Sequence, residues 1–98
     1  MPTLHAARTV ARAARRAAVF KALGEPTRLR IVDFLRRRRG WATGTEVAED
    51  AGISLALLCH HAEALVEAGV VRKRKEGQTS YWRLNRGLLA AVSRQLGA

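Results

Sequence analysis

The sequence has little cysteine, little acid and no long apolar run, and each shortage excludes a class of protein. Cys59 is the only cysteine among 98 residues, so an internal disulfide is excluded and a reducing compartment, the cytoplasm, is expected. No apolar run approaches the roughly 20 residues of a membrane-spanning helix, so no membrane partner is expected. Eight acidic residues oppose 18 Lys and Arg, an excess that predicts a polyanionic partner, most simply a nucleic acid.

The chain also lacks the motifs of an enzyme or a metalloprotein. It has no glycine-rich phosphate loop and no nucleophile with an evident base, so no catalytic residue is expected. Cys59, His60 and His61 are consecutive, and neighbours on a helix point about 100° apart, so they cannot hold one tetrahedral metal ion. We therefore expect no enzyme activity, no metal and no cofactor.

The positive charge lies on the two flanks of the sequence. Residues 1–24 hold five basic side chains and no acid, and residues 25–39 hold six arginines against two acids. Residues 40–69 contain five acids and no Lys or Arg, whereas residues 70–98 hold seven basic side chains and one acid. A polyanion would therefore be held mainly by the flanks. The Arg36–Arg39 run can be such a clamp or simply a solvated helix end.

Apolar periodicity, proline and glycine predict four helices in the first two thirds of the chain. The first spans about 4–23, and the second opens at Pro26 and has an apolar face. That face is formed by Leu29, Ile31, Val32, Phe34 and Leu35. A capping box at residues 43–46 and an N-cap at Ser54 mark a helix-turn-helix over about 45–68. Leu58, Ala62 and Leu65 define the inner side of its second helix.

After Gly69 the apolar period changes from about 3.6 to 2, which predicts a β-hairpin over about 70–84 that turns at residues 76–78. Trp82 and Leu84 are expected to point inward, and residues 86–96 form a last amphipathic helix. The order is α-α-α-α-β-β-α. This predicts a mainly α single domain over 1–98, a winged helix-turn-helix with a small β-hairpin.

Residues 1–20 allow two interpretations. They are rich in Arg and Ala and free of acids, as mitochondrial transit peptides are. Alternatively, they form an amphipathic helix with a stripe of small side chains on which a second helix can pack closely. Leu4, Ala7, Ala11, Ala14 and Ala18 form this stripe. The pattern continues without a cleavage-like break, which favours the folded helix.

Five segments in order resemble the ArsR/SmtB family of bacterial repressors. They are LGEPTRLRI at 23–31, EVA before GIS at 46–54, CHHAEAL at 59–65, LVEAGVV at 65–71 and RKEGQ at 74–78. The resemblance covers about two thirds of the chain, roughly 20–84. It implies a homodimer built on the helices at about 4–23 and 86–96, which binds an inverted-repeat operator as a transcriptional repressor.

The resemblance fails at the metal sites of the family. Thr43 and Thr45 stand where the family's best-known site has cysteines, and hydroxyls are poor ligands for soft metals. Residues 86–98 contain no Asp, Glu, His or Cys for the family's other site. No metal sensor is expected, and the effector, whether a small molecule or a protein, is unassigned.

In this fold the helix starting after Ser54 enters the major groove of double-stranded DNA, and the hairpin contacts phosphates. The residues expected at the DNA are Ser54, Leu55, Ala56, Cys59, His60, Arg72, Arg74, Lys75, Gln78 and Thr79. Leu55 and Ala56 can contact thymine methyls, which predicts an A·T-containing operator. Packing of Leu55 beneath the turn is the alternative.

Two other functions stay open. The same fold can serve as a protein-interaction module whose basic residues maintain solubility. A DNA-binding regulator can also respond to thiol modification at Cys59, because added bulk there would lie at the DNA face. An RNA-binding role is less favoured, since the aromatic residues form no evident stacking platform.

Overall fold

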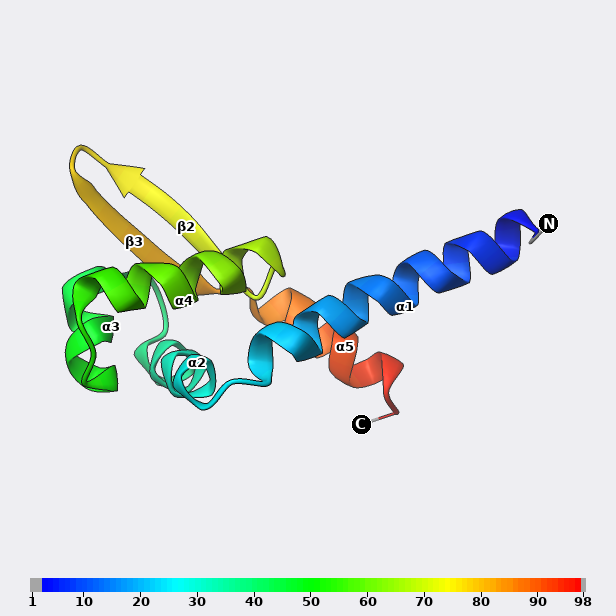
Figure 1. Ribbon diagram of the computed structural model, residues 1–98, viewed down its shortest axis with the longest axis horizontal. Coiled ribbons are helices and arrows are strands. Elements are labelled where there is room, and N and C mark those ends of the chain that lie inside the picture. The colour runs from blue at the N-terminus through cyan, green and yellow to red at the C-terminus, as the bar shows by residue number, and fades with distance from the viewer. Residues whose placement is uncertain (1–2, 98) are drawn as a thin grey trace.

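The computed structural model of the protein describes residues 3–97, so residues 1, 2 and 98 of the predicted domain lie outside this range. The described chain has five helices and three strands (Figure 1). The elements are α1 (Leu4–Leu23), α2 (Pro26–Arg38), β1 (Ala42–Thr43), α3 (Gly44–Ala51), α4 (Leu55–Glu67), β2 (Val71–Glu76), β3 (Thr79–Leu84) and α5 (Arg86–Gln95).

The helices begin where their capping residues predict. The Thr43 hydroxyl accepts a hydrogen bond from the Glu46 backbone N–H at 3.2 Å, and Ser54 does the same for Leu57 at 3.1 Å. Each bond satisfies one of the N–H groups that a helix start leaves without a partner. The Glu46 carboxylate also accepts a hydrogen bond from the Thr43 hydroxyl at 3.2 Å, and, beside the larger effect of Arg38, its contacts with Thr43 lower the pKa of Glu46.

The predicted hairpin is part of a three-stranded antiparallel sheet with the order β1-β3-β2. β1 was missed by the sequence analysis. The predicted order α-α-α-α-β-β-α therefore lacks one strand, which lies between α2 and α3. Ala42 pairs with Trp82 and Thr43 with Tyr81, so β1 covers the edge of β3 that a free hairpin would expose. β2 and β3 pair from Val71–Leu84 to Glu76–Thr79. Gly77, with φ +58°, supplies the positive φ that the tight turn requires.

The core lies where α2, α3 and α4 meet the sheet. Its largest fully buried side chains are Ile31, Leu35, Val47, Leu58, Leu65 and Val70. Trp82 and Leu84 are buried as predicted. Leu29 is not part of this core, being 47% exposed. The reason is geometric: Leu29 precedes Ile31 by two residues, which places it about 200° around α2 and therefore on the opposite side.

α1 runs out from the body and α5 lies beside its C-terminal half, while the β2–β3 hairpin projects toward the opposite end (Figure 1). Val19 and Ala22, near the end of α1, are buried in the core, so this end of the helix packs against the rest of the domain. Leu4 and Val10, farther along α1, are 67% and 68% exposed. None of the helices in residues 3–97 is both long and apolar enough to span a bilayer.

Candidate nucleic-acid interface

α4 has an inner side in the core and an outer side in solvent. Leu58, Ala62 and Leu65 are buried, as predicted. Of the residues expected at DNA, Ser54, Leu55, Ala56 and His60 are exposed, and Cys59 is half-buried. Gly52, with φ +69°, ends α3 and allows α4 to start at a new angle. The N-terminal half of α4 is therefore open to a macromolecular partner.

Leu55 is both exposed, as a contact with DNA would require, and packed against the turn, which was the alternative interpretation. Its side chain is 52% exposed, yet its Cδ1 would lie only 2.8 Å from a Cβ placed on Gly44. It lines a surface pocket of about 320 Å³ between the starts of α3 and α4 and the hairpin, which Cys59, Thr79 and Ser80 also line. One side of Leu55 thus packs on the start of α3, and the other remains available for contact.

The hairpin carries its basic residues on two faces. Val71, Lys73 and Lys75 share one face, toward α4, because they pair with the inward-facing side of β3. Lys73 donates to the Glu63 carboxylate of α4 at 2.8 Å, so this lysine joins hairpin and helix. Lys75 is exposed and forms no ion pair within residues 3–97.

Arg74 lies on the other face and is engaged within the protein. Its guanidinium carbon stands 4.7 Å from the centroid of the Trp41 ring and 5.8 Å from that of Tyr81. It also forms an ion pair with Glu76 at 3.3 Å. These cation–π and ionic contacts hold the guanidinium against the hairpin. Lys75, Gln78 and Thr79 stay exposed around the turn.

Trp41 is a site residue that the sequence analysis missed. Besides Arg74, it receives the guanidinium of Arg83, 6.0 Å from its ring centroid. The residue directly precedes β1, and without that strand nothing in the sequence places an aromatic ring beside the hairpin. The only feature of the sequence that could have indicated this role is the position of the tryptophan directly before the two residues Ala42 and Thr43.

Two of the five acids of residues 40–69, Glu46 and Asp50, are paired with arginines of α2. Arg38 Nε lies 3.0 Å from Glu46, and Asp50 lies 3.9 Å and 4.0 Å from Arg30 and Arg37. The hydrogen bond from Arg38 lowers the pKa of Glu46 and outweighs the opposing effect of desolvation. The Arg36–Arg39 run is thus partly engaged in internal ion pairs, which favours the helix-end interpretation over a phosphate clamp.

His61 is held on the inner flank of α4. Arg28 Nε donates to His61 Nδ1 at 3.1 Å, and the Glu25 carboxylate lies 3.7 Å from the same nitrogen. Within residues 3–97 no group of three His, Cys, Asp or Glu side chains is arranged to hold a metal ion. His61 therefore fixes α2 against α4, and His60 alone of the pair faces solvent.

The comparisons with known proteins agree with this geometry. A helix-turn-helix domain family matches residues 23–74, just over half of the chain. The transcriptional repressor SdpR of Bacillus subtilis (strain 168) is 38% identical over 71 residues, covering 72% of this chain and 77% of that protein.

Solved structures show the same architecture. A homodimeric winged helix-turn-helix DNA-binding domain from Mycobacterium bovis superposes with a TM-score of 0.77 at 28% identity, covering 91% of this chain and 82% of that one. An ArsR-like transcriptional regulator from Rhodococcus sp. RHA1 gives a TM-score of 0.78 at 28% identity, covering 89% and 80%.

The helix-turn-helix, the exposed side of α4 and the basic hairpin are the features of a winged helix-turn-helix protein. The chain is therefore a DNA-binding transcriptional regulator. The chain belongs to the ArsR/SmtB-type family of these regulators, as the motifs from residue 23 onward indicated. Such regulators are a class of DNA-binding proteins and not a class of enzymes.

Proposed function

We propose that the chain is a cytoplasmic repressor that dimerises through α1 and α5 and binds an inverted-repeat operator. The observation that carries this proposal is the exposed N-terminal half of α4 flanked by a hairpin that presents Lys75. Exposed apolar side chains of α1 and at the end of α5 support dimerisation, because a lone chain would leave them in water. They are Leu4, Val10, Phe20 and Leu96, the last of which follows α5. The Mycobacterium bovis neighbour is homodimeric, which supports a dimer for this chain as well.

The proposed division of labour at the DNA follows the two surfaces. Ser54, Leu55, Ala56, Cys59 and His60 would face base edges, with the two apolar residues against thymine methyls. Arg72, Lys75, Gln78 and Thr79 would contact the backbone, and Arg74 would stabilise the hairpin from its seat on Trp41. Because phosphate contacts fix register and base contacts give specificity, the affinity should depend mainly on the hairpin.

Binding to the promoter of the chain's own operon tests the proposal. We expect a footprint with two-fold symmetry and an affinity that falls steeply as salt rises, because each phosphate contact releases a counterion. The measurement is footprinting followed by fluorescence anisotropy from low to high salt. A protein-interaction module would give no footprint, and its weak attraction to DNA would be equal for all sequences.

Replacing Leu55 with glutamine should change base preference while the fold is kept. Glutamine has a similar length and can form a bidentate hydrogen bond to adenine, so we expect a shift of about 1–3 kcal/mol in discrimination at one base pair of each half-site. Selection from a randomised operator library would measure it. Leu57→Gln is the matched control, since Leu57 is 44% exposed on the same helix but is not among the residues expected at the DNA. If both variants keep the wild-type preference, Leu55 does not contact bases.

A further inference from the structure

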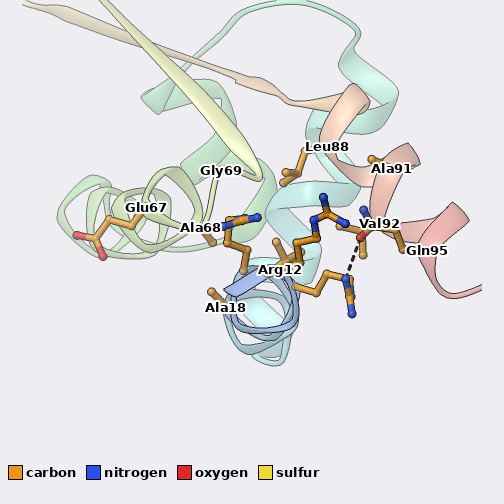
Figure 2. A pocket seen from close by; sticks show the side chains of 12 residues that line it. Arg12, Ala18, Glu67, Ala68, Gly69, Leu88, Ala91, Val92 and Gln95 are labelled. Carbon is orange, nitrogen blue, oxygen red and sulfur yellow. Dashed lines mark hydrogen bonds between the residues drawn. The ribbon is translucent and has the colours of Figure 1, made fainter. Parts of the chain in front are cut away.

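A pocket of about 390 Å³ opens where α1, α5 and the end of α4 meet (Figure 2). This volume lies within the roughly 300–1,000 Å³ typical of small-molecule sites. Its walls combine apolar side chains with three arginines of α1. The apolar part comes from Ala18, Val19, Ala68, Leu88, Ala91 and Val92, and the arginines are Arg12, Arg15 and Arg16.

The three arginines lack a counter-charge. None forms an ion pair within residues 3–97, and the nearest polar partner is Gln95, whose Oε1 accepts from Arg16 Nη1 at 3.5 Å (dashed in Figure 2). Glu67 also lines the pocket, but its carboxylate is turned away from Arg12 (Figure 2). Three guanidinium groups beside an apolar wall therefore favour a ligand that brings a negative charge.

A second copy of the chain would not supply that charge through the helices proposed to dimerise. Residues 1–24 and 77–98 contain no Asp or Glu, so pairing α1 and α5 with their copies brings only more arginine to this region. Like charges at a two-fold interface repel, and a bound anion would remove part of that cost. A diffusible ligand fits the charge of the pocket better than a partner helix does.

We propose that this pocket binds a small amphipathic anion, a carboxylate with an apolar chain, which acts as the effector. The carboxylate would pair with Arg12 and Arg15, and the chain would lie against Leu88, Ala91 and Val92. The pocket joins the proposed dimer helices to Ala68 and Gly69 at the end of α4. A ligand wedged there would change how the two α4 helices are spaced, and would weaken DNA binding. The effect of the ligand on DNA binding rests on the proposed function, whereas the binding of the ligand to the pocket does not.

Isothermal titration with decanoate below its micellar range tests the binding. We expect saturable binding of one decanoate per protomer, with 1-decanol and acetate each weaker by about tenfold or more, because each lacks one half of the recognised chemistry. Equal affinity for decanol would overturn the proposal, since binding would then need no anion.

Matched variants locate the ligand. Arg12→Gln with Arg15→Gln should weaken decanoate by about tenfold or more, whereas Arg8→Gln with Arg94→Gln removes the same charge outside the pocket and should leave it unchanged. Ala91→Leu provides a second route that keeps the arginines: it fills the pocket and should abolish binding. Unaltered affinity in both pocket variants would place the ligand elsewhere.

Operator binding in the presence of decanoate tests the regulation. We expect the dissociation constant for DNA to rise by about tenfold in the wild type and to stay constant in Ala91→Leu. If the protein binds DNA but not decanoate, this inference fails and the proposed function stands. If it binds decanoate but no DNA, the pocket stands and the proposed function fails. If it binds both without mutual influence, decanoate is not an effector.

Discussion

Replacing Trp82 with alanine is expected to lower the free energy of unfolding by about 3–5 kcal/mol. Trp82 is 3% exposed and pairs with Ala42 of β1 on one side and Lys73 of β2 on the other. Its Cζ3 would lie 3.0 Å from a Cβ on Gly44, so the ring also packs on the start of α3. Alanine would leave a cavity at the junction of sheet and helix-turn-helix. Urea unfolding followed by far-ultraviolet circular dichroism measures the change.

Trp41→Ala is the matched control for this prediction. Both substitutions remove an indole next to the sheet, but Trp41 is only half-buried and covers the hairpin's arginines rather than the core. We expect it to cost less than Trp82→Ala, and Trp82→Phe to recover most of the loss because an aromatic ring still fills the site. A larger loss for Trp41→Ala would mean that the sheet is stabilised from its outer face.

The helices were predictable because their signals are local. Thr43 and Ser54 each cap a helix through an N–H three residues away, and Leu58, Ala62 and Leu65 mark the inner side of α4 within two turns. Each signal involves residues close in sequence, so no tertiary information was needed. The same holds for the hairpin, whose turn at Gly77 joins strands that are adjacent in sequence.

The features that could not be predicted depend on contacts between residues that are far apart in the sequence. β1 has only two residues, too few to show a period, and its pairing with Trp82 and Tyr81 bridges some 40 positions. Arg74 looks like any hairpin cation in the sequence, yet Trp41 determines where its guanidinium lies. Leu29 matched an apolar segment of α2, and only its position around the helix shows that it faces out. The pocket between α1 and α5 likewise joins segments at opposite ends of the chain.

Replacing both Arg74 and Lys75 with glutamine should weaken operator binding by about tenfold to a hundredfold. It should also reduce the slope of log K against log salt by about 1–2. The structure assigns different contributions to the two residues. Lys75 is exposed and unpaired within residues 3–97, so the single variant Lys75→Gln should account for most of the change in slope. Arg74 is seated on Trp41, so Arg74→Gln alone should act mainly by loosening the hairpin.

Fluorescence anisotropy over a range of salt concentrations separates the two residues from a general loss of charge. Arg8→Gln with Arg94→Gln lowers the net charge by the same amount on α1 and α5, away from the hairpin, and should leave the slope near its wild-type value. If the two double variants change the slope of log K against log salt equally, the salt dependence reflects the total charge of the protein and not the hairpin. A larger slope change in Arg74→Gln than in Lys75→Gln would mean that Arg74 leaves Trp41 to reach the phosphates.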